Sequence, residues 1–366
     1  MSATAWLDSL SPWPRDGFGV ERMRELLAEL GDPQDAYPAI HVVGTNGKST
    51  ATVTIEQLLL AHGLSVGATI SPHVASWSER IRVDGAEIDF EEAVARVRLA
   101  AERLEATQFE IVTAAALTAF ADARVDAAVV EAGLGGRLDA TNVLRTRVVL
   151  LTNVALEHTD VLGDTVEAIA REKLAVAPAE GVVVLPDSTF EHLVPPGCTV
   201  VIGGAHEAAE AFAGHALARR PAPQLPGRIE RRESEVRDGA HNPDGVRYLV
   251  EQLRGPGPRS DFTVVVSILA DKDADRMLRE LRRVGSRLVA TRSSSERALP
   301  AERVAELARV HFDHVEAIES PLEAVARAHL LGGPVLVTGS LYLVGDLAQG
   351  EAQGEAQRER RAAWRT

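Results

Sequence analysis

A short glycine-rich stretch that contains a lysine has the residue types that bind phosphate groups. It is Gly-Thr-Asn-Gly-Lys-Ser-Thr at residues 44–50, and it follows an apolar run at residues 40–43. Glycines let backbone N–H groups point into one concavity, and the N-terminus of a following helix favours anions. Lys48 adds a positive charge, and the hydroxyls of Ser49 and Thr50 are suitable ligands for Mg²⁺. The stretch therefore predicts a phosphate loop, with an ordinary strand-to-helix turn as the alternative.

Lysine is rare in this chain, so its positions are informative. Among the 39 basic residues, only Lys48, Lys173 and Lys272 are lysines. Arginine does not replace lysine where a compact charge or a primary amine is needed. A biased composition that leaves three lysines by chance is the alternative. For Lys272, which stands between two aspartates, a solvated turn, a structural ion pair and a place at the edge of a ligand all remain open.

Acidic and histidine side chains follow two further apolar runs. Glu131 ends the run at 126–131, and His158 comes just after the run at 148–154. Carboxyl ends of parallel strands meet at one edge of a sheet, so we expect both side chains near the phosphate loop. A hard cation prefers carboxylate oxygen there, although a purely structural role is the alternative for His158. The glycine-rich segment 133–142 between the two runs suits close approach of backbone to a ligand.

Another segment with reactive side chains begins just after a predicted strand at 63–70. Residues 71–81 bring together His, Trp, Glu and Arg in an irregular loop. In α/β folds, loops beyond the carboxyl ends of strands commonly bind substrate. A surface excursion with one hydrogen-bonded histidine is the alternative.

The elements that must position these residues alternate between apolar strands and amphipathic helices, which predicts an α/β fold with parallel sheets. A proline-rich linker at 219–227 separates two parts. We expect a nucleotide-binding domain with a P-loop at 1–225, a smaller Rossmann-like α/β domain at 226–350, and a frayed helix or disordered tail at 351–366. Helices are predicted at 20–30, 48–63, 89–106, 109–122, 165–177, 274–284, 300–310 and 321–331, and the second domain's strands at 262–269, 287–291, 315–318 and 334–338.

Composition narrows the classes of partner. The formal net charge is −14 and the isoelectric point is about 5.3, which argues against nucleic acid or an acidic membrane as the main partner. A single cysteine, Cys198, excludes an intramolecular disulfide and fits a reducing compartment. We find no signal peptide pattern and no apolar run long enough to span a membrane. We therefore expect a cytoplasmic protein.

Several motifs, taken together and in order, resemble folylpolyglutamate synthase/dihydrofolate synthase of the bifunctional bacterial type, a branch of the Mur ligase superfamily. They are G-T-N-G-K-S-T (44–50), S-P-H-V (71–74), E-R-I (79–81), Q-F-E (108–110), E-A-G-L-G-G-R-L-D-A-T-N (131–142), L-T-N-V-A-L-E-H-T-D-V-L-G (151–163), R-E-K (171–173), P-G-R-I-E (226–230), D-G-A-H-N-P (238–243), L-A-D-K-D (269–273) and T-G-S-L-Y-L-V-G (338–345).

The resemblance implies an ATP-dependent ligase that adds L-glutamate to dihydropteroate, to the γ-carboxyl group of a reduced folate, or to both, through an acyl phosphate. It also implies ATP, two Mg²⁺ sites, carbamylation of Lys173 and a monomer. The catalytic residues that it implies are Lys48, Glu131, His158 and Lys173. The implied ATP-binding residues are Gly44, Thr45, Asn46, Gly47, Lys48, Ser49, Thr50, Arg228, Asp238, His241 and Asn242. The implied folate-binding residues are Ser71, Pro72, His73 and Arg80, and the implied metal ligands are Ser49, Thr50, Glu131, His158 and Lys173 as its carbamate.

The chain departs from the family pattern at three places. Ser49 replaces the second glycine of the family's loop, and residues 174–225 are short, with His206-Glu207 in place of a pattern rich in amide side chains. The strand expected before residue 238 is only S-E-V-R. Three other functions therefore stay open: a Mur-type ligase with a non-folate acceptor, a folate-binding or nucleotide-binding relative with weakened catalysis, and a P-loop phosphotransferase or regulatory ATPase.

Overall fold

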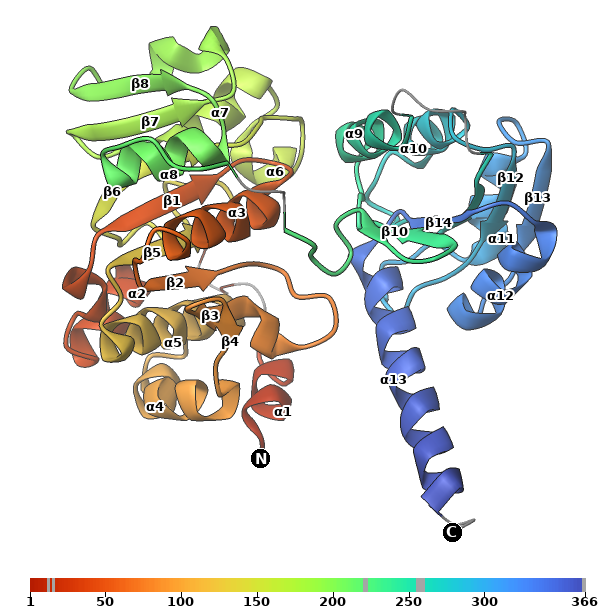
Figure 1. The fold of residues 1–366 in the computed structure, drawn as a ribbon, viewed down its shortest axis with the longest axis horizontal. Helices are drawn as coiled ribbons and strands as arrows, with labels where there is room; N and C mark the ends of the chain where they lie inside the picture. The colour runs from red at the N-terminus through yellow and green to blue at the C-terminus, as the bar shows by residue number, and fades with distance from the viewer. Residues whose placement is uncertain (12–13, 15–16, 220–222, 255–260, 364–366) are drawn as a thin grey trace. The chain divides into compact units, whose positions relative to one another are not determined.

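The chain folds into two compact units, Met1–Pro223 and Gln224–Thr366, and each is an α/β unit (Figure 1). The computed structural model describes residues 1–363 except 12–13, 15–16, 220–222 and 255–260, and for residues 354–363 it describes the backbone only. The linker predicted at 219–227 therefore lies partly outside the described residues. The predicted fold class is confirmed, since parallel strands make up most of both sheets.

The first unit is built on an eight-stranded sheet with the order β4-β3-β2-β5-β1-β6-β7-β8. Its strands are β1 Ala39–Val43, β2 Val66–Thr69, β3 Ile81–Val83, β4 Ala86–Glu87, β5 Ala127–Glu131, β6 Thr146–Leu151, β7 Gly181–Leu185 and β8 Cys198–Ile202. Only β3 and β4 run antiparallel to their neighbours. In the central strand, Val42 pairs with Glu131 and Val43 pairs with Leu151. The loop after β1 thus begins between the ends of β5 and β6.

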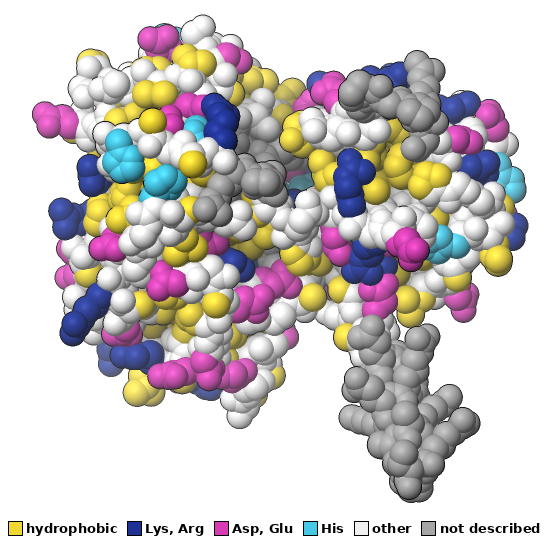
Figure 2. Space-filling model, viewed as in Figure 1, with side chains coloured by type: hydrophobic (Ala, Val, Ile, Leu, Met, Phe, Trp, Pro, Cys, Tyr) yellow, Lys and Arg dark blue, Asp and Glu magenta, His cyan; other side chains and the backbone are white. Residues whose placement is uncertain are grey.

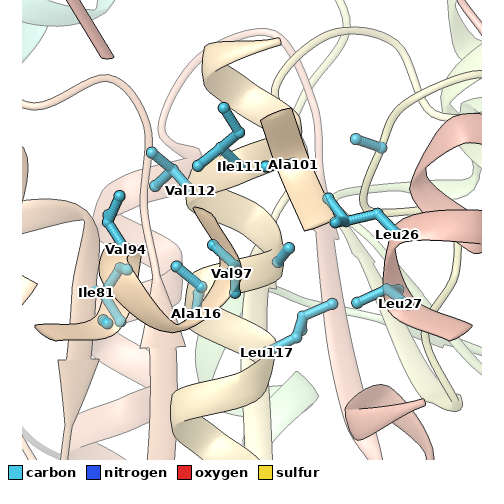
Figure 3. Packing of buried hydrophobic residues seen from close by; sticks show 14 of the residues in the cluster. Leu26, Leu27, Ile81, Val94, Val97, Ala101, Ile111, Val112, Ala116 and Leu117 are labelled. Atoms are coloured by element: carbon cyan, nitrogen blue, oxygen red, sulfur yellow. The ribbon is translucent and has the colours of Figure 1, made fainter. Parts of the chain in front are cut away.

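Helices cover both faces of this sheet. They are α1 Ala3–Asp8, α2 Glu21–Glu29, α3 Lys48–Leu60, α4 Phe90–Arg103, α5 Gln108–Ala123, α6 Thr159–Leu162, α7 Val166–Leu174 and α8 Ala205–Ala213, with 3₁₀ turns at Pro33–Ala36, Trp77–Arg80 and Ser188–Leu193. On one face α2, α4 and α5 bury a cluster that includes Leu26, Val97 and Leu117 (Figure 3). On the other face α3 and α8 cover Ile40 and Val42. Alternate residues of β1 therefore serve the two layers.

The second unit has a six-stranded sheet with the order β13-β12-β11-β14-β10-β9, in which only β9 is antiparallel. Its strands are β9 Glu230–Arg231, β10 Glu235–Arg237, β11 Thr263–Val266, β12 Arg287–Ala290, β13 His314–Ala317 and β14 Val335–Thr338. Its helices are α9 Pro243–Leu253, α10 Ala274–Leu281, α11 Ala301–Ala308, α12 Pro321–Leu331 and α13 Leu341–Ala363. The helix α13 includes residues 351–363, which the sequence placed in a frayed helix or disordered tail.

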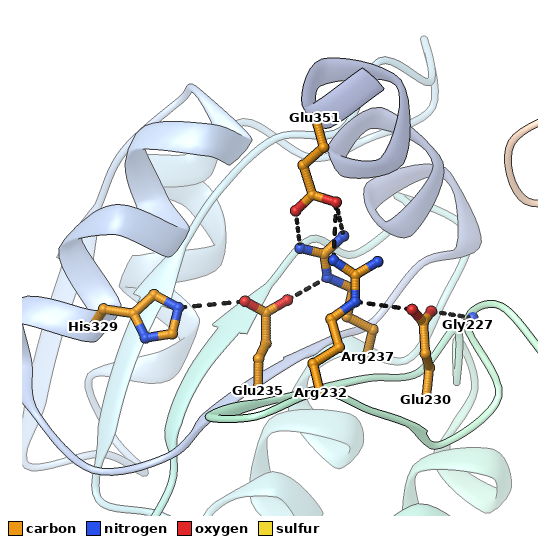
Figure 4. A network of polar contacts seen from close by, with 7 residues as sticks. All are labelled: Gly227, Glu230, Arg232, Glu235, Arg237, His329 and Glu351. Atoms are coloured by element: carbon orange, nitrogen blue, oxygen red, sulfur yellow. Dashed lines mark hydrogen bonds and ion pairs between the residues drawn. The ribbon is translucent and has the colours of Figure 1, made fainter. Parts of the chain in front are cut away.

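Strand β10 lacks an apolar pattern because a buried ion pair occupies it. Arg237 is only 2% exposed, and its guanidinium contacts the carboxylates of Glu235 and of Glu351 on α13 (Figure 4). Arg232 donates to Glu351 and to Glu230 at 2.9 Å each. These contacts supply the charge compensation that a buried guanidinium requires. The segment S-E-V-R therefore forms a strand despite its polar sequence.

The predicted strand at 148–154 begins two residues too late and ends three residues too late. β6 ends at Leu151, and residues 152–155 turn away to hydrogen-bond with the loop after β1. Residues 174–225, for which no element was predicted, contribute β7, β8 and α8.

The surface of the protein carries side chains of both charges (Figure 2). On the face drawn in Figure 2, acidic and basic side chains are interspersed. Within the described residues, no helix is long and apolar enough to cross a membrane.

Candidate active site

The phosphate loop has two positions that only glycine fills without strain. Gly44 has a φ of 150°, and a Cβ there would lie 1.9 Å from the hydroxyl oxygen of Thr152. Gly47 has a φ of 80° and precedes the first turn of α3. A side chain is disfavoured at such φ values, so both glycines are required for this turn.

The loop is held by the segment that follows β6. The N–H groups of Thr45 and Asn46 donate to the carbonyl and side-chain oxygens of Asn153 at 3.0 and 2.9 Å. The Thr152 hydroxyl donates to the Asn46 carbonyl at 2.8 Å. Since Asn153 uses the first two N–H groups, an anion must rely mainly on the first turn of α3, whose N–H groups have no intrahelical acceptor. The side chain of Ser49, in that turn, is 5% exposed.

Two of the three lysines reach this one loop. Lys48 Nζ donates to the carbonyl of Thr45 at 3.3 Å, and Lys173 Nζ donates to the carbonyl of Gly44 at 2.8 Å. Lys173, on α7, is 4% exposed. Burial, helped by the charge of Lys48, lowers the pKa of Lys173 to about 7, against the opposing effect of nearby acidic residues such as Glu157. A sizeable fraction of this amine is therefore neutral and nucleophilic near pH 7.

Two of the predicted metal ligands, Glu131 and His158, are carried by segments at or beyond strand ends of the first sheet. Glu131 is 3% exposed at the end of β5, and its carboxylate accepts the N–H of Ser71 at 3.1 Å. His158 is exposed, with a φ of 51°, immediately before α6. Among the described residues, no group of three or more His, Cys, Asp or Glu side chains is placed to hold a metal ion. This donor set fits Mg²⁺, which is commonly held by one or two carboxylates together with phosphate oxygens of a substrate.

The segment 71–80, here named the Ser71 loop, is ordered by its own side chains. The Glu79 carboxylate accepts the N–H groups of Val74, Ala75 and Ser76 at 2.6–2.8 Å. Arg80 Nε donates to Nδ1 of His73 at 2.9 Å, and its guanidinium carbon lies 4.4 Å from the centroid of the Trp77 ring. These contacts give His73 a structural partner and also hold the segment in one conformation.

His73 is neutral near pH 7. Burial, together with the charge of Arg80, lowers the pKa of His73 to about 4. Because Nδ1 accepts the hydrogen bond from Arg80, the neutral ring carries its proton on Nε2. The loop therefore offers an Nε2–H donor beside the carboxyl end of β2.

The second unit holds its predicted residues at the end of β10. Asp238 is 8% exposed and accepts the N–H groups of Ile229 and Ala240 at 2.8 Å each. His241 Nδ1 donates to the carbonyl of Gly239 at 2.9 Å, which leaves its Nε2 as the acceptor when the ring is neutral. Asn242 caps α9, since its side-chain oxygen accepts the N–H of Gly245 at 2.7 Å. Asn242 thus has a structural role, whatever else it contacts.

The structure places the remaining predicted residues, Arg228, His206 and Glu207, in contacts with residues that are near them in the sequence. Arg228 Nη1 donates to the carbonyl of Gly227 at 3.3 Å. Burial raises the pKa of Asp238, and the charge of Arg228 offsets part of this effect. In the first unit, His206 contacts Glu210 at 3.1 Å, and Glu207 accepts the N–H of Gly204 at 2.8 Å. The residues that replace the family's amide pattern are therefore engaged within and beside α8.

Sequence reasoning missed two groups of buried polar side chains. One joins His41, Thr141 and Asp139 beneath the phosphate loop. The other is a set of buried hydroxyls at the carboxyl ends of strands in the second unit, namely Ser267, Ser293, Thr338 and Ser340. In both cases the sequence contains one indication of such a group, namely a polar residue that lies inside an apolar run or directly after it.

Models of Mur ligase domains match both units of this chain. The model of the Mur ligase middle domain matches residues 42–194, and the model of the Mur ligase glutamate ligase domain matches residues 227–341. A dihydrofolate synthase/folylpolyglutamate synthase from Mycobacterium tuberculosis is 32% identical, over 87% of this chain and 84% of that protein.

Solved structures agree over nearly the whole chain. Escherichia coli FolC in complex with DHPP and ADP is 27% identical, with a TM-score of 0.83 and coverage of 98% of this chain and 99% of that one. A bifunctional folylpolyglutamate synthase/dihydrofolate synthase with Mn, AMPPNP and L-glutamate bound is also 27% identical, with a TM-score of 0.81 and coverage of 95% and 97%.

Proposed function

This chain belongs to the dihydrofolate synthase/folylpolyglutamate synthase family, and on that premise we propose that it joins L-glutamate to dihydropteroate, to the γ-carboxyl group of a reduced folate, or to both, at the expense of ATP. The observation that carries the proposal is the buried amine of Lys173 on the carbonyl of Gly44. A phosphate loop alone serves many reactions. A second, buried lysine aimed at its first glycine matches the lysine that the resemblance to the ligase family implies for this site.

Each part of the site has a role in the proposed reaction. Lys48 and the first turn of α3 bind the terminal phosphates, and the ordered Ser71 loop, with His73 and Arg80, binds the folate substrate. In the second unit, Arg228, Asp238 and His241 contribute to nucleotide binding. Ser49, Thr50, Glu131, His158 and the carbamate of Lys173 would hold Mg²⁺ at two sites.

The chemistry needs an activated acyl group. A carboxylate oxygen of the acceptor attacks the γ-phosphorus of ATP, the bond to the β-phosphate oxygen breaks, and ADP leaves. The amine of glutamate then attacks the acyl carbon, loses a proton, and expels inorganic phosphate. The charge of Lys48 offsets negative charge on the transferred phosphoryl group. Bound Mg²⁺ would add to that charge compensation.

The carbamate belongs to the same proposal. Carbon dioxide adds only to a neutral amine, and Lys173 is both buried and partly neutral near pH 7. The adduct replaces an ammonium group by a carboxylate-like anion, which is a suitable ligand for a hard cation. An arginine cannot form it, which accounts for a lysine in a chain that otherwise uses arginine.

Phosphate release tests the proposal against the ATPase alternative. With ATP, Mg²⁺, L-glutamate and a folate acceptor all present, we expect steady release of inorganic phosphate. Omission of glutamate or of the acceptor should reduce the rate to background. Equal phosphate release without an acceptor would instead identify a regulatory ATPase.

A further inference from the structure

A buried chain of hydrogen bonds connects the strand before the phosphate loop to the glycine-rich segment after β5. His41 lies on β1 and is fully buried, and its Nε2 is 2.8 Å from the hydroxyl oxygen of Thr141. The Thr141 hydroxyl in turn donates to Oδ1 of Asp139 at 2.5 Å. His41 and Thr141 are 100 residues apart in sequence, so this chain joins two distant parts of the backbone.

The direction of each hydrogen bond follows from the donors available. A hydroxyl has one proton, and Thr141 uses it toward the carboxylate of Asp139. The oxygen of Thr141 must therefore accept a proton from Nε2 of His41. Burial keeps the ring neutral by lowering the pKa of His41 to about 3. Its Nδ1 is then an unprotonated nitrogen, and it has no hydrogen-bond partner among the described residues.

Asp139 is fixed from both sides. Its Oδ1 also accepts the N–H of Thr141 at 2.9 Å, and its Oδ2 accepts the N–H of Leu134 at 2.7 Å. The segment that carries Asp139 packs on the backbone of Lys173, since a Cβ at Gly136 would lie 2.7 Å from the Lys173 carbonyl oxygen. Burial raises the pKa of Asp139, while the hydrogen bonds from Leu134 and Thr141 and the charge of Lys48 oppose that effect. The charge of Asp139 in turn favours the protonated form of Lys173. The hydrogen bonds of the two ammonium groups nevertheless go to carbonyl oxygens of the phosphate loop.

We propose that His41 and Thr141 are positioning residues for the nucleotide site, because they hold Asp139 where its charge faces Lys48 and Lys173 without forming an ion pair with either. Each oxygen of Asp139 is occupied by donors of its own segment, so the lysines remain available for phosphate oxygens. Without the Thr141 hydroxyl, the carboxylate loses a donor and competes with the nucleotide for the lysines. The inference rests on the proposed function for the identity of the anion only.

A matched set of threonine variants tests the inference. Thr141→Val removes the hydroxyl at nearly constant volume, and Thr141→Ser keeps it. Thr52→Val is the control, because the Thr52 hydroxyl on α3 is buried and has no partner among the described residues. We expect the affinity for AMPPNP with Mg²⁺, measured by calorimetry, to fall about tenfold in Thr141→Val and to stay within about twofold of wild type in Thr141→Ser and Thr52→Val.

Enzyme kinetics and NMR spectroscopy distinguish a positioning role of Thr141 at the nucleotide site from a general loss of stability. In Thr141→Val, the KM for ATP should rise while the KM for glutamate is unchanged. Wild-type affinity in Thr141→Val, or an equal loss in Thr141→Ser, overturns the inference. If Thr141→Val does not fold, ¹⁵N NMR of the wild-type histidines decides: a proton on Nε2 of His41 is expected, and a proton on Nδ1 contradicts the chain. Nucleotide binding without ligation would count against the proposed function but not against this inference.

Discussion

Lys173 is the residue at which the proposed chemistry can be changed while the positive charge is kept. In Lys173→Arg the primary amine is lost, so no carbamate forms, and we expect turnover to fall by at least about a hundredfold. Initial rates of ADP formation with all substrates present measure the effect. Arg171→Lys, at an exposed position of the same helix, should leave the rate unchanged. Near-normal turnover in Lys173→Arg would show that the reaction does not need a carbamate at this position.

His41 should make the protein sensitive to acid. Its pKa is about 3 in the folded chain and has the usual value of 6.5 in the unfolded chain. Between these values only the unfolded state binds the proton, so the free energy of unfolding falls as pH decreases, by about 1.4 kcal/mol per pH unit. We expect the free energy of unfolding, measured with urea at pH 6 and pH 5, to fall less steeply in His41→Gln than in wild type by about this amount, since His73 and the other titrating groups contribute equally to both proteins. Equal slopes would mean that His41 is not buried in its neutral form.

At the residue scale, the sequence identifies groups whose type alone is informative. The scarcity of lysine singled out Lys48 and Lys173, and the structure brings both to the phosphate loop. The chain from His41 to Asp139 was not predictable in the same way. A histidine inside an apolar run only indicates burial, and its partner Thr141 belongs to a distant segment. Which residues so far apart become hydrogen-bond partners depends on the order of the strands in the sheet. Sequence patterns alone do not predict that order.

At the element scale, an ion pair ties the phosphate-loop helix to the hairpin that follows the Ser71 loop. Arg82 on β3 contacts the carboxylate of Glu56 on α3 at 3.0 Å, and the Glu56 side chain is fully buried. Arg82→Met leaves that buried carboxylate without its partner, which should cost about 3 kcal/mol of unfolding free energy. Urea denaturation measures it. The control, Arg303→Met, breaks an exposed pair with Glu306 on α11 and should cost below about 0.5 kcal/mol. Equal losses in the two variants would contradict this difference.

The predicted elements fail where a residue's role is not set by apolar burial. β6 was predicted to reach residue 154, but its last residues give their hydrogen bonds to the phosphate loop. The strand β10 was hard to recognise in the sequence because two of its residues, Glu235 and Arg237, are charged. Inside the sheet they compensate each other's charge. Strands and helices with regular apolar spacing, such as β5 and α12, were found close to their true bounds. Hydropathy patterns carry no information about such polar compensation.

At the scale of the whole molecule, the alternation of strands and helices was enough to predict two α/β parts with parallel sheets. It was not enough to predict the substrate, because one fold hosts many reactions and specificity resides in a few side chains. The folate assignment comes from motif order and family membership.

The most direct test of the central claim is the mass of the product. Purified protein is incubated with ATP, Mg²⁺ and L-glutamate, together with dihydropteroate in one reaction and tetrahydrofolate in another. The account predicts an increase by one glutamate residue in at least one reaction, and the reaction that shows it identifies the acceptor. Unchanged acceptors in both reactions, with ATP intact, would contradict a folate ligase and favour a different acceptor or a protein that binds without catalysis.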